Sequence, residues 1–200
     1  DGRLGNHEIT RMTLQDVVAP QPPSNTSIPV KIVTSDFADA GTAATPALTP
    51  ADASLALVRV SGPSGARVLE SHDGERSWSA LALHLPRYEG PQVAINPRDP
   101  HTFYIGSTSR GLLKSSDGGS SWRAVHPARV ISFALDPAGT LYLLSDTGLF
   151  KSTDGGSSWS ALPLELRDEE AAWSLWAGPR GTVYTATPGR LLQSVDGGAN

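Results

Sequence analysis

A short segment built around Asp-Gly recurs along the chain and constrains the fold more than any other feature. Its copies are KSSDGGSSW at 114–122, KSTDGGSSW at 151–159, the diverged ESHDGERSW at 70–78, and QSVDGGAN at 193–200, which ends before a Trp. The aspartates of successive copies are 44, 37 and 42 residues apart. Self-similarity at such a period indicates an array of small structural units that pack on one another.

The residues before each copy repeat as well. Segments 93–115, 133–152 and 175–194 each hold an apolar strand, a turn with Pro, a second strand with a Tyr, another turn, and a third strand that ends at the Ser of the repeat. A fourth strand is expected after each Trp, and no segment has a helical period. Four antiparallel strands that recur about every 40 residues are typical of a β-propeller blade. The sequence therefore predicts an all-β fold made of propeller blades.

The residue types of the repeat suit a tight turn between the third and fourth strands. Asp accepts hydrogen bonds from nearby backbone N–H groups, and Gly adopts φ values that a Cβ disfavours. Ser and Thr hydroxyls add short bonds to the same turn, while Trp folds back as an apolar plug whose N–H needs an acceptor. The residues to which we assign this structural role are Asp73, Trp78, Asp117, Trp122, Asp154, Trp159 and Asp196.

The segments resemble the Asp-box, or BNR, repeat with the pattern Ser-x-Asp-Gly-Gly-x-x-Trp, over about residues 55–200. The longer string INPRDPHTFYIGSTSRGLLKSSDGGSSW is similar to sialidase-like, sortilin-type, xyloglucanase-like and photosystem II assembly factor-like propellers. The resemblance implies that the box lies at the blade periphery, between the third and outermost strands and away from the central pocket. The alternative, that the four aspartates are catalytic or bind calcium, lacks the Asp-x-Asp-x-Asp spacing of a calcium loop.

Two parts of the chain differ in composition. Residues 1–50 are rich in Pro, Ala, Thr and Ser and predict a leader or linker, in which 29–33 (PVKIV) could form one strand that closes a propeller. Residues 51–200 suffice for about three and a half blades, whereas propellers usually have about 4–8. We therefore expect an incomplete propeller, truncated at its C-terminal end, that further blades or a second chain complete. Alone, it should expose a sheet edge and associate.

Composition argues against several classes of function. The net charge of -4 and the absence of a Lys/Arg cluster argue against a nucleic-acid partner. The chain has no cysteine and its five histidines lack zinc spacing, so we expect neither a metal nor another cofactor. No apolar run approaches the ~20 residues of a membrane helix. We expect an exported bacterial protein, extracellular or periplasmic.

Candidate site residues lie in the loops between second and third strands and in those that lead into the next unit, where ligands of propellers usually bind. A glycosidase needs two carboxyl groups across the scissile bond. The carboxylates in these loops could supply them, but the interpretation that we favour is that they are solvated surface charges. The candidate catalytic residues are Asp146, Asp168 and Glu169, with Glu170 beside them. The candidate ligand-binding arginines, suited to an anion, are Arg110, Arg129 and Arg190.

Trp176 is an exception to the repeat, because it takes the place of Ala94 and Ala134 on the innermost strand. A flat indole near the centre of a propeller could stack on a sugar. It could equally fill a gap that small residues leave between blades, and this packing interpretation is the one that we favour.

The leading hypothesis is a non-catalytic propeller module that binds a protein or a glycan on one face. One alternative is a fragment of a sialidase-like or xyloglucanase-like glycoside hydrolase, and another is an assembly or receptor scaffold. A sialidase-like enzyme would need an arginine cluster and a Tyr–Glu pair. Tyr104, Tyr142 and Tyr184 instead occupy equivalent strand positions, as packing residues would.

Overall fold

The chain divides into two units, residues 1–30 and 31–200, and everything described below belongs to the second. The computed structural model describes residues 47–48, 54–62, 65–74, 76–81, 83, 92–164 and 172–199. The strand that we predict at 29–33 lies outside these residues, and the division of the chain at residue 50 stays a prediction.

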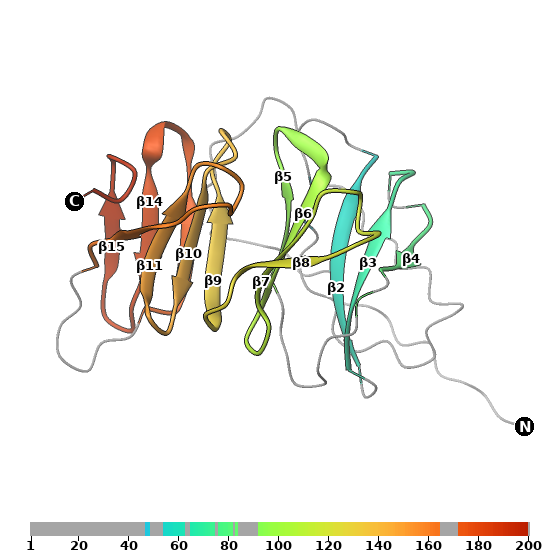
Figure 1. Cartoon of the computed structure of the whole chain (residues 1–200), viewed down its shortest axis with the longest axis horizontal. Coiled ribbons are helices and arrows are strands. Elements are labelled where there is room, and N and C mark those ends of the chain that lie inside the picture. The colour runs from blue at the N-terminus through green and yellow to red at the C-terminus, as the bar shows by residue number, and fades with distance from the viewer. Residues whose placement is uncertain are drawn as a thin grey trace, which may run out of the picture. The chain divides into compact units, whose positions relative to one another are not determined.

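The described residues form four antiparallel sheets in which the strands follow one another in chain order (Figure 1). The first sheet contains β1 (Ala47–Leu48), β2 (Ala56–Gly62), β3 (Gly65–Ser71) and β4 (Ser79–Ala80). The second contains β5 (Gln92–Asn96), β6 (Asp99–Ser107), β7 (Gly111–Ser115) and β8 (Arg123–His126). The third contains β9 (Val130–Leu135), β10 (Leu141–Ser145), β11 (Gly148–Ser152) and β12 (Ser160–Leu162). The fourth contains β13 (Ser174–Ala177), β14 (Val183–Ala186) and β15 (Leu191–Ser194), with a 3₁₀ turn at Pro179–Gly181.

These sheets confirm the predicted all-β class, and three of them have the four strands predicted for a blade. Each blade is a meander in which every strand pairs with its sequence neighbour, as short turn-linked strands of alternating polarity favour. The first strand, β1, lies inside the segment that we predict as a linker. Among the described residues no helix is long and apolar enough to cross a membrane.

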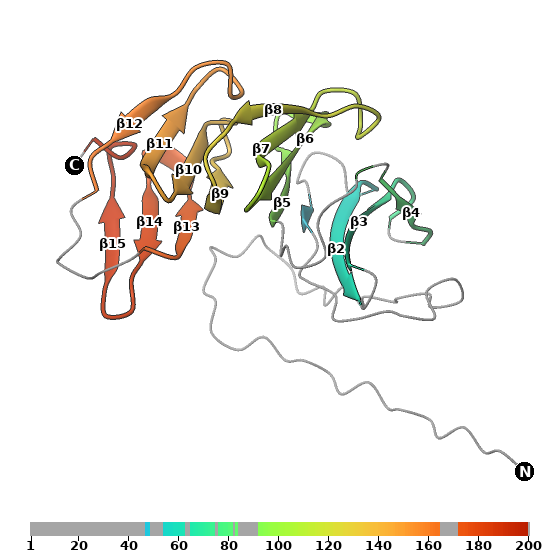
Figure 2. The same cartoon turned by 60° about the horizontal axis from the view of Figure 1, so that its bottom comes forward.

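Apolar side chains join successive sheets into one stacked array. Figure 2 shows the backbone of these sheets from a second side. Because side chains alternate between the two faces of a strand, each sheet has one face for the sheet before it and one for the sheet after it. Leu57 of β2 packs with Phe103 and Ile105 of β6, all three fully buried. Tyr104 and Tyr142 are also fully buried, in the two following clusters, as the packing interpretation of the repeated tyrosines predicts.

The strand order gives every sheet two distinct ends. The Asp-Gly boxes follow the third strands β3, β7, β11 and β15, so they lie at one end, which we call the box end. The hairpins between second and third strands, together with the connection from β8 to β9, lie at the other end, which we call the loop end. The fold thus separates the most regular segments of the sequence from the least regular ones.

Candidate functional site

The box at 114–122 is organised around a single carboxylate. Oδ1 of Asp117 accepts bonds from the Ser115 hydroxyl (2.7 Å) and the Ser121 N–H (2.9 Å), and Oδ2 accepts the Ser121 hydroxyl (2.6 Å). The Ser115 hydroxyl oxygen accepts the N–H of Gly119 at 2.8 Å. Asp73 and Asp154 make the corresponding bonds within their own turns, and Asp196 accepts the Ser194 hydroxyl and the Ala199 N–H. A carboxylate with this many local donors fixes the turn and has little capacity left for a ligand.

These hydrogen bonds also determine the ionisation of the boxes. The bond from the Ser121 hydroxyl, followed by the Ser121 N–H, lowers the pKa of Asp117 to about 2. Bonds from the equivalent serines, Ser77 and Ser158, hold the pKa values of Asp73 and Asp154 well below their usual range. Donors that bond the charged form stabilise it, so these carboxylates stay ionised at any physiological pH. They cannot supply the protonated acid that hydrolytic chemistry needs.

Side chains of one sheet hold the box of the next sheet. Nζ of Lys114 donates to the Gly155 carbonyl at 3.0 Å, and the Tyr104 hydroxyl reaches the same oxygen at 3.4 Å. One unit later Nζ of Lys151 donates to the Gly197 carbonyl at 3.2 Å. Burial lowers the pKa of Lys114 and raises that of Tyr104 to about 12. Lys114 with Tyr104, and Lys151 one unit later, thus bind a carbonyl of the next box.

The box tryptophans are anchored in two ways. Nε1 of Trp122 donates to the Gly119 carbonyl of its own box at 3.0 Å. Nε1 of Trp159 donates at 2.9 Å to the carbonyl of Val125, which belongs to β8 in the preceding sheet. Trp78 is half-buried. This geometry supports the structural role that we assign to the boxes, and it places them away from the loop end.

At the loop end, buried hydroxyls shape three of the four hairpins between second and third strands. The Ser107 oxygen accepts the N–H of Arg110 (2.9 Å), and the Thr187 oxygen accepts that of Arg190 (3.1 Å). In the hairpin between them the Ser145 oxygen accepts the N–H of Thr147 at 3.2 Å. In each of these hairpins the hydroxyl at the end of the second strand accepts a backbone N–H of the loop, so the loop is ordered without any ligand. The loop end is therefore a preformed surface.

Four of the described residues that we predict as a site lie in loops at the loop end. Arg110, Arg129 and Asp146 are exposed there, and Arg190 is half-buried. Arg129 follows a connection that His126 shapes by accepting the Ala128 N–H on Nδ1 at 3.3 Å. Trp176 is different, because it lies in the middle of β13, opposite Tyr184 of β14, and is 53% exposed. Asp168 and Glu169 lie outside the described residues, as does Glu170.

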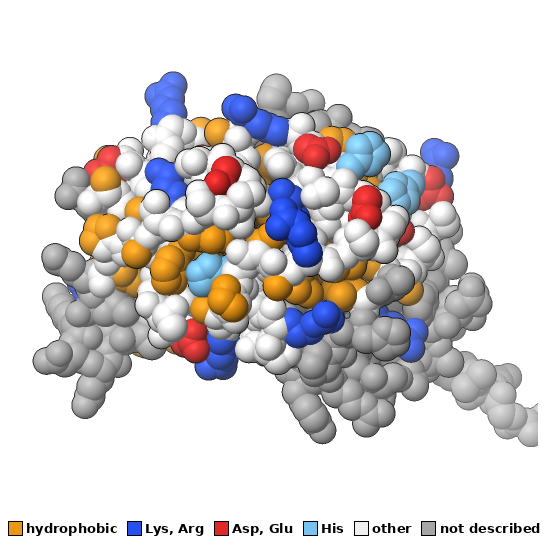
Figure 3. Space-filling view, in the orientation of Figure 1, with side chains coloured by type: hydrophobic (Ala, Val, Ile, Leu, Met, Phe, Trp, Pro, Cys, Tyr) orange, Lys and Arg blue, Asp and Glu red, His pale blue; other side chains and the backbone are white. Residues whose placement is uncertain are grey.

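Two large apolar residues at the loop end are absent from the predicted site. Trp173 precedes β13, donates its backbone N–H to the Ala186 carbonyl at 3.0 Å, and leaves 59% of its side chain exposed. Ile131, at the equivalent place on β9, is exposed as well. The sequence does offer one signal for Trp173, because an aromatic residue stands there at the start of an innermost strand. The face drawn in Figure 3 shows basic and acidic groups scattered among apolar and uncharged ones.

The described residues contain no group of three or more His, Asp or Glu side chains that could hold a metal ion. Asp146 is the carboxylate of the described loop-end hairpins, and the other carboxyl group of a glycosidase pair would have to come from elsewhere. A pair of Asp146 with Asp168 or Glu169 stays a prediction, because the latter two lie outside the described residues.

Comparison with known proteins gives a fold and leaves the activity open. No protein-family model matches the sequence, and no curated protein does. An ancestral GH74 enzyme shares the fold at a TM-score of 0.64 and 21% identity, over 81% of this chain and 24% of that one. The GH74 xyloglucanase of Xanthomonas campestris matches at a TM-score of 0.55 and 22% identity, over 75% of this chain and 28% of that one.

The extracellular domain of a B. thetaiotaomicron protein matches at a TM-score of 0.52 and 14% identity, over 76% of this chain and 21% of that one. The described sheets are therefore blades of a β-propeller. The chain spans about a quarter of the length of the GH74 chains that it matches. Similarity at this level of identity concerns the backbone arrangement alone.

Proposed function

We propose that this chain is part of an Asp-box, or BNR, propeller that recognises a glycan or a protein through its loop end without chemical conversion. The boxes hold the blades, and the preformed hairpins at the opposite end present Arg110, Arg129 and Asp146 to the partner. Rigid scaffolds with variable loops commonly bind ligands in this way.

The observation that supports this proposal most strongly is the exposure of Trp173. Trp173 is 59% exposed and lies beside the hairpin that contains Arg190, where a partner can reach it. Its flat apolar face suits the C–H side of a sugar ring or an apolar side chain of a protein, and Trp and Arg dominate the energetic centres of interfaces. Trp173 is the main contact in our proposal, and the arginines orient an acidic or polyhydroxylated partner.

A binding experiment on the full chain tests this proposal. Soluble xyloglucan oligosaccharides and sialyllactose serve as the glycan probes, and calorimetry measures the affinity. We expect Trp173→Ala to remove binding, while the matched change Trp176→Ala in the middle of β13 leaves it intact. Loss of binding in Trp176→Ala alone would favour the sugar platform on the sheet face instead. Retained binding in both variants would contradict a tryptophan-centred site.

The alternative is a glycoside hydrolase of sialidase-like or xyloglucanase-like type, of which this chain supplies some blades. GH74 enzymes are among the structures that share the fold of this chain, which supports this alternative. Turnover of xyloglucan or of a sialoside by the full chain, lost on Asp146→Asn, would overturn the non-catalytic proposal. The same screen applies to Asp168 and Glu169.

A second observation favours a protein partner on the fourth sheet, as an assembly or receptor scaffold would require. The Gln92 Oε1 accepts the N–H of Phe133 at 2.8 Å, and the Ser132 oxygen accepts that of Leu175 at 3.0 Å. Each residue thus binds the innermost strand of the following sheet. Ser174 is the next member of this series, and its hydroxyl is buried without a partner among the described residues.

The face that contains Ser174 therefore matches the faces on which the third and fourth sheets pack. Trp176, Tyr184 and Leu191 lie on this side of the fourth sheet, with Trp176 and Leu191 exposed. Further blades, or a second chain, are the partner that such a face would fit. For the location of the protein we propose an exported bacterial protein, extracellular or periplasmic, which suits a glycan or surface partner.

A further inference from the structure

One buried histidine lies where the second and third sheets meet. His126 ends β8 and is 9% exposed, whereas His72 and His101 are exposed. The centroid of its ring lies 5.1 Å from that of the Trp159 indole, edge-on, and 4.9 Å from that of Phe150 on β11. An apolar environment of this kind favours the neutral imidazole over the charged one.

An irregularity in the strand pairing turns His126 into this space. His126 pairs with Leu112 of β7, but the next pair is Ala124 with Leu113, so Val125 is an extra residue on β8. A bulge of this kind re-aims the side chain beside it.

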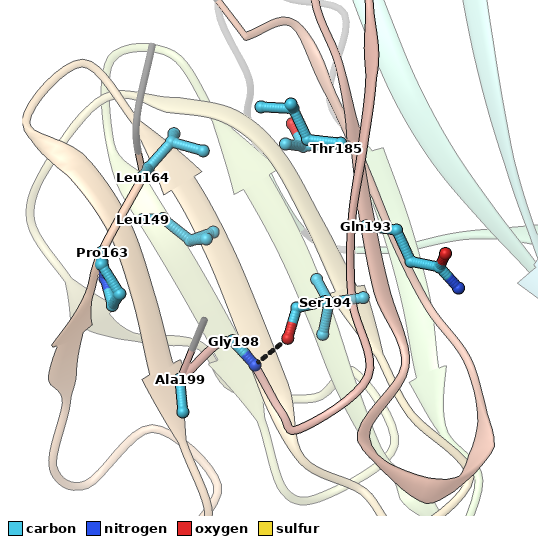
Figure 4. Close-up of a pocket in the computed structure, with 10 residues that line it drawn as sticks. Leu149, Pro163, Leu164, Thr185, Gln193, Ser194, Gly198 and Ala199 are labelled. Atoms are coloured by element: carbon cyan, nitrogen blue, oxygen red, sulfur yellow. Dashed lines mark hydrogen bonds between the residues drawn. The ribbon is translucent and has the colours of Figure 1, made fainter.

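The repeat itself does not require a histidine here. Counted from the box Trp, the residue equivalent to His126 is Ala82 in the preceding unit and Pro163 in the following one. Pro163 lines an apolar groove of about 350 Å³ between the third and fourth sheets (Figure 4). The histidine is therefore a property of one connection, that from β8 to β9.

The neutral ring orders this connection. Nδ1 of His126 accepts the Ala128 N–H at 3.3 Å, so the proton of the neutral ring lies on Nε2. Arg129 comes next and is exposed, and Val130 begins β9 with its side chain buried. A protonated imidazole carries a hydrogen on both nitrogens and cannot accept the Ala128 bond.

The connection also abuts the neighbouring hairpin. Gly111 follows Arg110 at the start of β7, and a Cβ on this glycine would overlap the His126 carbonyl. Because backbone meets backbone here, a shift of the connection is transmitted to the hairpin.

The charges around His126 do not favour a cationic ring. Burial lowers its pKa, so the ring gains a proton more readily when the connection releases it to water. The acidic group on the packed elements, Asp154, is bonded within its own box, and Lys114 and Lys151 bond box carbonyls. The charged side chains on the elements around the ring are Arg110, Lys114, Arg123, Arg129, Lys151 and Asp154.

We infer that His126 positions the connection that contains Arg129 and releases it when the ring takes up a proton. An exposed histidine titrates near pH 6.5, so the ordered connection is favoured above this pH and released progressively below it. His126 is a positioning residue, because it acts on the loop end through the backbone of 127–129. Its effect on a partner rests on the function proposed above, whereas the release is a property of the fold.

Hydrogen exchange at the Ala128 amide of the full chain, followed by NMR at about pH 7.5 and about pH 5, tests this inference. After correction for intrinsic exchange rates, we expect the protection of Ala128 to fall at least about threefold at the lower pH, because the ring no longer accepts its N–H. The box carboxylate of Asp117, with a pKa of about 2, does not titrate in this range. Equal protection at both pH values would overturn the inference.

Two variants separate the acceptor from the ring. His126→Asn keeps an oxygen near the place of Nδ1 but does not titrate, so the protection of Ala128 should be the same at both pH values. His126→Phe keeps a ring without an acceptor and should lower protection at both. His101→Asn, at an exposed position, is the control and should retain the fall of the parent chain. A fall that persists in His126→Asn would contradict the assignment.

The parent chain gives a second readout if these variants do not fold. The NMR signals of the His126 Nδ1 and of the Ala128 amide should titrate with one common midpoint, because the two atoms share a hydrogen bond. Different midpoints would overturn the inference.

Sialyllactose, whose carboxylate suits Arg129, measures the consequence for recognition. We expect its affinity to fall at the lower pH in the parent chain and to stay constant in His126→Asn. A fall of equal size in both would show that His126 does not control the loop end. Absence of sialyllactose binding at either pH would count against the function proposed above, while the protection of Ala128 still decides the inference.

Discussion

The four box aspartates show how one residue type can be conspicuous in a sequence and still be unsuited to catalysis. Each accepts bonds from a serine or backbone group of its own turn, and these bonds consume the carboxylate oxygens. The sequence predicts this role from residue type, because Asp, Gly and Ser at these spacings suit a turn. It does not reveal that the box Trp159 binds the preceding blade, since that contact joins residues 34 positions apart.

Acid should weaken the fold through these residues. The pKa of Asp117 in the folded chain, about 2, lies below the unfolded value near 3.9, so its contribution is complete above about pH 4 and is lost as the pH falls towards 2. Asp117→Asn should lower the thermal midpoint at pH 7 and flatten its dependence on pH between 4 and 2. Circular dichroism melts across this range measure both effects. An unchanged acid dependence in the variant would contradict the assignment.

The indole of Trp159 should stabilise the chain by its hydrogen bond as well as by its area. Trp159→Phe removes the bond to the Val125 carbonyl but keeps most of the apolar contact, so we expect a loss of about 1 kcal/mol in the free energy of unfolding. Urea unfolding gives the value, and Trp173→Phe at the exposed position serves as the control with little change. Equal effects of the two changes would show that the bond contributes nothing.

At the scale of the elements, the repeat predicts the strands but not the contacts between blades. Tyr104 and Lys114 are paired in register on β6 and β7, and both reach the box of the next sheet. The first sheet has Leu57 and Glu70 at these two positions. Gly118, the equivalent of Gly155 in the following box, has open space within 4 Å of where a Cβ would lie, so no described side chain of the first sheet packs against it as Lys114 packs against Gly155. Adjacent blades are thus held by different chemistry, which a search for repeated letters does not reveal.

Removing a lysine that joins two blades tests this element-scale account. Lys114→Met keeps the apolar stem of the side chain but leaves the Gly155 carbonyl with the Tyr104 hydroxyl alone, and we expect a loss of about 1–2 kcal/mol. Arg98→Met, at an exposed turn, is the control for charge removal. Equal stability of Lys114→Met and the parent chain would show that the contact between blades is energetically neutral.

The limits of the sequence are clearest on the innermost strands. The alignment identifies Trp176 as unusual, yet only the structure shows that Trp173 lies at the loop end and is exposed. Exposure depends on which sheet covers a strand face, and residues distant in sequence decide that. For the same reason the sequence could assign Arg110 and Asp146 to loops at one end of the sheets, but it could not predict how far these side chains lie from each other.

For the whole molecule, we expect association through the face of the fourth sheet. Trp176 and Leu191 place apolar surface beside the buried hydroxyl of Ser174, and unpartnered faces of this kind favour self-contact. Trp176→Glu should shift sedimentation towards monomer, whereas Trp173→Glu at the loop end should not. A parent chain that is a monodisperse monomer at high concentration would contradict this expectation.

The central claim is that recognition takes place at the loop end while the boxes hold the blades together. Its most direct test measures both ligand affinity and thermal midpoint for Trp173→Ala and Asp117→Asn, with the xyloglucan and sialyllactose probes. The account predicts that Trp173→Ala loses affinity at an unchanged midpoint, and that Asp117→Asn melts earlier with affinity intact below its midpoint. Affinity lost in folded Asp117→Asn and retained in Trp173→Ala would contradict it.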